Sequence, residues 1–311
     1  MALGKKGVFF TFVALTFLTL LIVSASVLNT YEMREKSFAI ETKVNSMDNF
    51  IVDVEEDIQR AAYISGFRSF VSMYEYTLTK GEYIDDVDSA FDELFLEGTL
   101  NGNVSTLLIN NTFTNWTTEI QEQAAEIGIN ITFVINDITV SQDDPWKIRI
   151  DLDLTLQIQD FQGVASWSKP EQLTSYVEIE GFGDPIYIIE TNGLVENKIR
   201  PSPFTTFVSG TDVTNLLNHT YEGYYINDGD APNYLQRLEG NVKTGSAQGI
   251  ESLVDLAEFS SKGVPTQDKS IVDHLYFEDK KNEGNHILGT PAWFKIDNNH
   301  KHLYQVDYIV G

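Results

Sequence analysis

Residues 146–158 read WKIRIDLDLTLQI, and this stretch decides the fold. Every second residue from Ile148 to Ile158 is Ile or Leu, and the residues between them are charged or polar. Because successive side chains of a strand point to opposite faces, this period of two predicts a long strand with one dry face. Asp151 and Asp153 fall on the other face, where we interpret them as solvated side chains rather than as an acid–base pair.

Further strands are predicted on both sides of this one. Residues 129–140 precede it and are joined to it by the turn segment 142–145, which reads QDDP. Residues 163–167 and 173–179 follow. Strands that are consecutive and closely connected favour an antiparallel β-meander.

Two short helices are predicted before the sheet. Residues 84–96 read as an acidic helix that ends at Gly98. Residues 115–127 read as a second helix, with Thr114 or Asn115 as its N-cap and Gly128 as its end.

A much longer helix is predicted at the N-terminus, over residues 8–79. Residues 8–28 carry no charge, and 21 residues at about 1.5 Å each span roughly 30 Å, the hydrocarbon thickness of a bilayer. Beyond them an apolar stripe recurs at alternating spacings of four and three. Its members are Ile40, Val44, Met47, Ile51, Val54 and Ile58. The stripe packs either on the chain's own outer domain or on copies of the chain, and Gly66 is a position where the helix could bend.

Around and beyond residue 200 the sequence pattern is less regular. Residues 186–189 predict a short strand, residues 249–259 a helix, and residues 292–296 with 303–306 a final hairpin. The predicted fold class is therefore α+β: a long N-terminal helix, transmembrane in its lower half, packed on an antiparallel meander, with a further mixed α/β region.

The expected organisation follows the same order. It comprises a basic leader (1–7), a transmembrane helix (8–28), an amphipathic helical stalk (29–80), an outer α+β domain (81–200) and a C-terminal mixed region (201–311) that is either separate or part of that domain.

Three interpretations compete for the N-terminus. Ser24, Ala25 and Ser26 offer a small-x-small site for cleavage of a secretory signal, although the apolar run is long for one. An uncleaved anchor is the second interpretation. Lys5 and Lys6 precede the span, so the positive-inside rule places the N-terminus in the cytoplasm and the rest outside.

The third interpretation rests on Lys5, Lys6 and Gly7 directly before Val8. This arrangement resembles the class III signal peptide of archaeal type IV pilin-like proteins. The resemblance covers about the first 30 residues. It implies cleavage between Gly7 and Val8, with the apolar helix retained in the membrane or packed in a filament. Many pilins carry Glu at the fifth mature position, where this chain has Phe12.

Composition excludes several classes of function. The formal net charge of −25 repels phosphate backbones, so we expect no nucleic-acid partner. The chain has no cysteine, which excludes disulfides, thiolate catalysis and cysteine-ligated metals.

Five N-x-Ser/Thr sequons, four of them between residues 103 and 132, predict glycosylation of an outer domain. The candidate acceptors are Asn103, Asn110, Asn115, Asn130 and Asn218.

No catalytic or metal-binding motif emerges. The sequence contains no G-x-S-x-G elbow, P-loop, H-E-x-x-H or dinucleotide fingerprint. His300 and His302 follow Asp297, but two imidazoles in one turn without a third ligand make a poor metal site. Residues 227–230, NDGD, do not match a calcium loop and read as a polar turn. We expect no enzyme activity, no metal and no cofactor.

These observations predict an outward-facing archaeal surface protein of pilin-like type, anchored in the cell membrane by a single span, with a structural or assembly role. Its expected partners are membrane lipid and copies of itself or other pilin-like subunits. The alternative is a monomeric anchored receptor or adhesin that binds an extracellular ligand.

Overall fold

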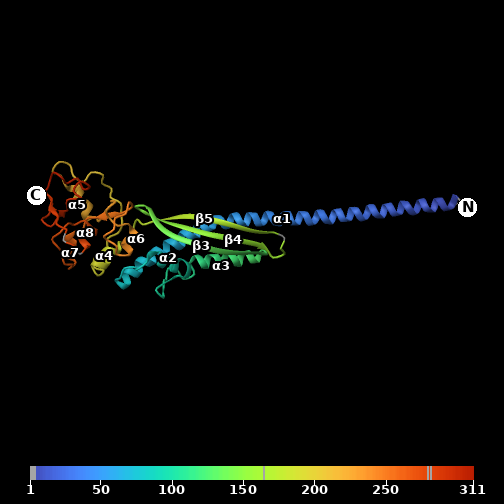
Figure 1. The fold of residues 1–311 in the computed structure, drawn as a ribbon, viewed down its shortest axis with the longest axis horizontal. Coiled ribbons are helices and arrows are strands. Elements are labelled where there is room, and N and C mark those ends of the chain that lie inside the picture. Colours follow the sequence, from blue (N-terminus) through green and yellow to red (C-terminus); the bar gives the residue numbers. More distant parts are fainter. Residues whose placement is uncertain (1–4, 164, 279, 281) are drawn as a thin grey trace.

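The computed structural model describes residues 5–163, 165–278, 280 and 282–311, and it is dominated by one helix. Helix α1 (Lys5–Lys80) is 76 residues long and runs through Gly66 without a break. Figure 1 shows its N-terminal end standing clear of all other elements, while its C-terminal part lies along the sheet. The described side chains from Gly7 to Thr42, Val13 excepted, are exposed. The N-terminal part of the helix is therefore bare, and its C-terminal part is packed against the rest of the fold.

The meander is confirmed. Strands β3 (Ile129–Asp144), β4 (Lys147–Asp160) and β5 (Ser166–Glu178) form an antiparallel sheet in that order. The alternate Ile and Leu residues of β4 from Ile148 to Ile158 are all buried at 2% exposure or less. The period of two in the sequence thus marks the face of the sheet that packs on the helices.

Two details of the sheet differ from the sequence prediction. The two strands predicted near residues 167 and 173 are one strand, β5, because Trp167 to Val177 pair continuously with β4. The segment predicted as a turn is mostly strand, since β3 continues to Asp144 and pairs there with Lys147.

Both short helices are confirmed, with one cap corrected. Helix α2 (Val87–Glu97) is capped by Asp86 and ends at Gly98, whose φ of 74° is in the left-handed region that glycine favours. Helix α3 (Phe113–Glu126) is capped by Thr112 rather than by Thr114 or Asn115. Asn115 is instead the third helical residue and completes a capping box with Thr112.

An apolar core joins these elements. A chain of ring contacts, with centroids 5.0–5.5 Å apart, crosses from α1 through α2 and α3 to β3. Its members are Phe70, Phe91, Phe95, Phe113, Trp116 and Phe133. The small hairpin of β1 (Thr99–Leu100) and β2 (Asn103–Val104) connects α2 to α3.

Gly66 marks the closest approach of α1 to the sheet. A Cβ atom at this position would lie 2.3 Å from Cδ1 of Ile150. The glycine therefore lets β4 come up against the helix, which explains its place in a helix interior where glycine is otherwise unfavourable.

The part of the molecule farthest from the N-terminus, the distal part, is built from short elements around a second apolar core. They are α4 (Pro185–Glu190), α5 (Thr214–Tyr221), β6 (Tyr225–Asn227), α6 (Tyr234–Leu238), β7 (Ile250–Ser252), α7 (Leu256–Ser261), α8 (Asp273–Phe277), β8 (Asn285–His286) and β9 (Lys295–Ile296). Strand β6 pairs with β7 and β8 with β9, both antiparallel. Tyr234 packs in the first core and Tyr187 in the second, so the chain crosses between the cores on both sides of residue 200.

Three sequence predictions in this part are wrong. The segment predicted as a strand at 186–189 is helix α4, because Asp184 caps it and Pro185 starts it. The helix predicted over 249–259 is strand β7 followed by α7, which begins at its own cap, Asp255. Strand β9 pairs with β8 instead of with residues 303–306, which lie in or beside the turns over 301–305.

Candidate functional site

The strongest candidate site is a cluster of one glutamate and two histidines in the distal part. Glu251 lies on β7, His274 on α8 and His300 in the turn after β9, and all three side chains are buried. Oε2 of Glu251 lies 3.4 Å from Nε2 of His274 and 3.3 Å from Nε2 of His300. One ligand atom from each residue falls within 4.8 Å of the other two. We call this group the Glu–His cluster.

Asp228 adds a second carboxylate to the edge of the cluster. Its Oδ2 lies 3.6 Å from Nε2 of His300. The antiparallel pairing of β6 with β7 brings it there, because Ile226 is opposite Glu251 and the backbone N–H of Asp228 donates to the carbonyl of Gly249.

The polar atoms that face one another in the cluster lack conventional partners. Both carboxylate oxygens of Glu251, Nε2 of His274 and Oδ2 of Asp228 are buried and make no hydrogen bond of good geometry within the described residues, and the ion-pair contacts among them and His300 are 3.3–3.6 Å long. Buried polar groups are hydrogen bonded in the great majority of cases, and leaving a charged one unpaired is costly. Such a concentration of unsatisfied atoms at one point is typical of a ligand site.

His300 is held in place from its other side. Its Nδ1 lies 2.9 Å from both carboxylate oxygens of Asp297, which also accepts hydrogen bonds from the Ser270 hydroxyl and the Asn299 backbone N–H. This arrangement directs Nε2 of His300 toward Glu251 and His274.

The charges around His300 strongly favour a cation. Burial lowers the pKa of His300, but the carboxylates of Asp228, Asp297 and Glu251 outweigh burial and raise that pKa to about 12. Burial raises the pKa of Asp297, but its bond to His300 prevails and lowers that pKa to about 2. The cluster therefore has the electrostatics of a site for positive charge, whether the cation is the imidazolium or a bound ion.

The cluster lies beside a cavity of about 570 Å³ that reaches the surface. His274, Asp297 and His300 line its inner side. Lys243, Glu278 and Asn282 also line this cavity. A small ion thus has a route from solvent to the cluster.

His300 lies in a turn, as the sequence predicted, but the structure brings further titratable side chains to it. His302 does point away, since its side chain is 98% exposed and lies 3.4 Å from Asp307. His300, however, meets His274 and Glu251, which are 26 and 49 residues away in sequence. The only sequence signal for them was a titratable residue inside each of two apolar segments, 250–254 and 271–277.

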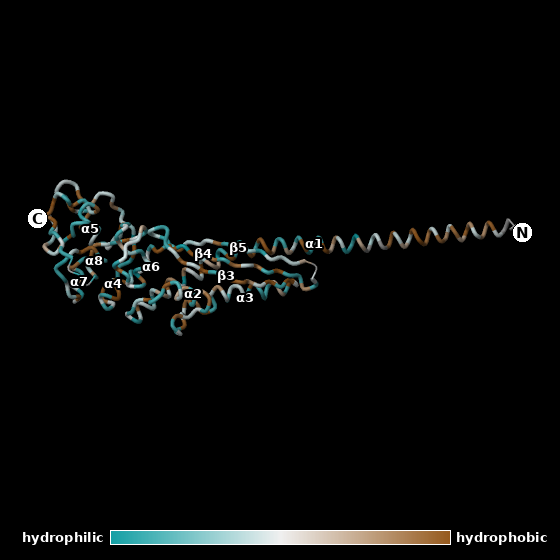
Figure 2. The backbone as a smooth tube through the Cα atoms, viewed as in Figure 1, coloured by the Kyte–Doolittle hydropathy of each residue, from teal (hydrophilic) through white to brown (hydrophobic). Residues whose placement is uncertain are grey.

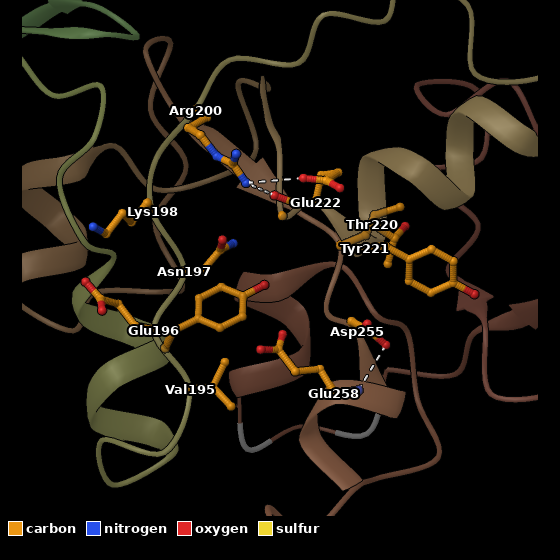
Figure 3. A pocket seen from close by; sticks show the side chains of 13 residues that line it. Val195, Glu196, Asn197, Lys198, Arg200, Thr220, Tyr221, Glu222, Asp255 and Glu258 are labelled. Atoms are coloured by element: carbon orange, nitrogen blue, oxygen red, sulfur yellow. Dashed lines mark hydrogen bonds and ion pairs between the residues drawn. The ribbon is translucent and has the colours of Figure 1, made fainter. Parts of the chain in front are cut away.

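A second cavity, of about 410 Å³, lies between α4, the segment 195–200, α5 and α7. Figure 3 shows carboxylates and cations around it, with Arg200 directed toward Glu222 and Asp255 bonded to the start of α7. The Asp255 carboxylate is committed to that helix cap. The cavity is a mixed-charge pocket of small-molecule size.

The distal part also contains a buried arginine that the sequence analysis missed. Nη1 of Arg237 lies 2.6 Å from Oδ2 of Asp184 and 3.0 Å from Oδ2 of Asp273. Tyr225 and Ser252 donate hydroxyl hydrogen bonds to the same two carboxylates. All of these groups are buried and paired, so we assign this network to the stability of the fold.

Comparison with known protein families, with curated proteins and with solved structures finds no match to this chain.

The N-terminal part of α1 is long and apolar enough to cross a membrane. Figure 2 shows an almost continuous apolar colour along the end of the helix that stands clear of the fold. Large apolar side chains are exposed there, among them Phe9 at 64%, Leu21 at 69% and Leu28 at 63%. In water such a surface would be unstable, and in a bilayer it is the expected one.

The predicted processing site lies at the start of this helix. Met1 to Gly4 fall outside the described residues. Lys5, Lys6, Gly7 and Val8 form the first turns of α1, and Val8 is 59% exposed.

The apolar stripe packs mainly within the chain. Met47, Ile51, Val54 and Ile58 are buried in the first core, at exposures of 6% or less. Assigning these four side chains to contacts between copies is therefore wrong, because the sheet already covers them. Val44 is half-buried and Ile40 is 48% exposed, so only the lower end of the stripe is open.

The sequons occupy different environments. Asn103, Asn110, Asn130 and Asn218 are exposed, while Asn115 is half-buried and its Oδ1 accepts hydrogen bonds from Thr112. Exposure leaves four of the five candidate acceptors accessible at the surface.

Proposed function

We propose that this chain is an outward-facing archaeal surface protein of pilin-like type, anchored in the membrane by α1, with a structural or assembly role. One observation carries the proposal. A single uninterrupted helix begins as an exposed apolar segment of membrane-spanning length and ends buried in the core of a sheet domain. A helix of this kind holds a rigid domain at a fixed distance from the membrane.

The orientation of the chain rests on charge. Lys5 and Lys6 precede the apolar segment, and the acidic excess of the chain lies beyond it. The positive-inside rule therefore favours a cytoplasmic N-terminus and an extracellular sheet domain.

Assembly, in this proposal, uses the bare part of α1. The segment between the span and the sheet exposes Tyr31 at 70%, Met33 at 66% and Phe38 at 71%. Helices of neighbouring copies can pack through such side chains, whereas the buried stripe above them is already occupied.

The mass of the membrane-extracted protein tests the N-terminal processing. We expect loss of residues 1–7 in the wild type and retention of them in Gly7→Leu. Gly4→Leu is the matched control and should be processed normally. A wild-type chain that keeps Met1 to Gly7 would contradict pilin-like processing, and a chain that has lost residues up to Ser26 would contradict anchorage itself.

Cross-linking and sedimentation of membrane extracts test assembly. Phe38→Asp combined with Ile40→Asp should abolish high-mass species, because it places charge on the bare helix. Val52→Asp is the control, since Val52 is 50% exposed on the packed part of α1. Assemblies that survive the double substitution would rule out the bare helix as the contact.

A monomeric anchored receptor or adhesin is the second candidate function. The pocket beside Arg200 and Asp255 favours it, because the elements around this pocket lie at the end of the molecule opposite the N-terminus (Figure 1). A processed protein that stays monomeric at all concentrations would support this candidate over assembly.

A further inference from the structure

We propose that Glu251, His274 and His300 form a zinc site, with Asp228 at its edge. The inference does not depend on membrane anchorage or assembly, since it rests only on the distal part.

The donor atoms suit this metal. Zinc in proteins is bound by imidazole nitrogens and carboxylate oxygens as well as by thiolates, and four-coordinate sites are usual. Two imidazole nitrogens with a carboxylate oxygen are a borderline donor set that suits zinc better than calcium or magnesium, which prefer oxygen alone.

The distances also suit it. In a tetrahedron the ligand–ligand distance is about 1.63 times the metal–ligand distance, so zinc bonds of about 2.0–2.1 Å place the ligands about 3.3–3.4 Å apart. The observed separations from Oε2 of Glu251 are 3.3 Å to His300 and 3.4 Å to His274. Asp228 lies 3.6 Å from His300, at the edge of the same arrangement.

An ion-pair network without a metal fits these distances less well. Charge-assisted hydrogen bonds between imidazolium and carboxylate are about 2.7–2.9 Å long. The contact of His300 with Asp297 has that length, at 2.9 Å, but the contacts of His300 with Glu251 and Asp228 are longer. The Nδ1 side of the ring is thus hydrogen bonded, and the Nε2 side has the spacing of atoms that share an ion.

Asp297 supplies the outer support that zinc-binding histidines usually have. A ligating histidine almost always donates its other ring N–H to a carboxylate or carbonyl, which fixes the ring and its tautomer. Asp297 occupies this position for His300 and is itself held by Ser270. Asp297 therefore holds the His300 ring in the orientation that a ligand needs.

Such an ion would join three separate segments of the chain. Glu251 is on β7, His274 on α8 and His300 in the turn after β9. In a chain without cysteine, and so without disulfides, one metal ion at this point would cross-link the three segments. We therefore assign the zinc a stabilising role.

Metal analysis of the full-length protein in detergent tests the site. The protein is stripped with a chelator, dialysed against zinc chloride and analysed for metal by mass spectrometry. We expect one zinc per chain, and a thermal unfolding midpoint that rises with zinc and falls again with chelator.

Substitutions distinguish zinc binding at this site from zinc binding at the protein surface. Glu251→Gln and His300→Asn should each weaken zinc affinity by at least about tenfold and abolish the thermal shift, and Asp297→Asn should weaken affinity about 10–100-fold. His302→Ala is the matched control, because His302 lies in the same turn and is exposed. It should bind zinc as the wild type does.

Several outcomes would overturn the proposal. A stripped wild type that binds no zinc, or binds it without a thermal shift, excludes the site. Equal loss in His302→Ala and His300→Asn would assign binding to the surface. If Glu251→Gln fails to fold, His274→Gln replaces it, and the wild-type measurements decide the question regardless of either variant.

Discussion

The sheet region and the distal part of this molecule are stabilised in different ways. Around α1 and the meander, the core is a continuous set of apolar and aromatic side chains placed by two regular periods. In the distal part the elements are short, and charged or titratable groups are buried among the apolar ones, among them Arg237, Asp273, Glu251 and His274. One region depends on area removed from water, and the other depends also on specific polar pairs.

The difference teaches where each region is vulnerable. An apolar core loses stability in proportion to the volume removed. In a buried polar network, removing one partner lowers the free energy of unfolding by more than the whole network contributes to it. The reason is that the remaining charge stays buried without its partner. The following predictions test this contrast, beginning with the largest expected effect.

Arg237→Ala should cost about 3–5 kcal/mol in the free energy of unfolding, since it leaves the carboxylates of Asp184 and Asp273 buried without their cation. Urea unfolding measures the loss, and hydrogen exchange should place it in the distal part. Arg60→Ala removes an exposed pair with Asp57 and should cost less than about 1 kcal/mol. Similar losses of stability in Arg237→Ala and Arg60→Ala would show that the buried pairs stabilise the fold no more than an exposed pair does.

Ile150→Ala should cost about 2–5 kcal/mol by opening a cavity where β4 meets α1. Val134→Ala, on the neighbouring strand but 39% exposed, should change stability by no more than about 0.5 kcal/mol. Here hydrogen exchange should increase in the sheet. Increased exchange confined to the distal part would show that the two regions do not respond separately.

His219 makes the distal part sensitive to acid. Burial lowers its pKa to about 3 from an ordinary value of 6.5, so the unfolded chain binds a proton that the folded chain does not. The stability contributed by the neutral ring is therefore present above pH 6.5 and falls by roughly 1.4 kcal/mol per pH unit below it, until about pH 3. Unfolding measured from pH 7 to pH 4 should show a shallower pH dependence in His219→Gln than in the wild type. Unchanged dependence in that variant would assign the acid sensitivity to other groups.

Thr112→Ala should cost about 1 kcal/mol, because Thr112 caps α3 and forms a capping box with Asn115. Thr118→Ala is the control, since Thr118 is an exposed residue within the same helix. A thermal unfolding comparison of the two variants is sufficient. Equal midpoints would mean that the cap adds nothing to a helix already held by its aromatic contacts.

The sequence predicted the first region well because its signals are local and periodic. The alternation in β4, the uncharged run of α1 and the glycine that ends α2 each determine an element without reference to the rest of the chain. The cap of α3 was misplaced by two or three residues because Thr112, Thr114 and Asn115 are all good capping residues, and tertiary packing chooses among them.

The second region could not be predicted in the same way. The segment 186–189 has a strand composition, yet Asp184 and Pro185 start a helix there. Glu251 is placed by the pairing of β7 with β6, a contact between residues about 25 apart. The Glu–His cluster then needs three such long-range arrangements at once, and no spacing in the sequence encodes them.

The bare part of α1 has a mechanical consequence. In an anchored chain, residues 29–42 lie between lipid and sheet, which at about 1.5 Å per residue is roughly 20 Å of helix without lateral support. A sideways push on the distal end acts through the full length of the sheet domain upon this unsupported stretch. Bending therefore concentrates in residues 29–42. The sheet domain then moves as a rigid body about this flexible segment instead of deforming internally.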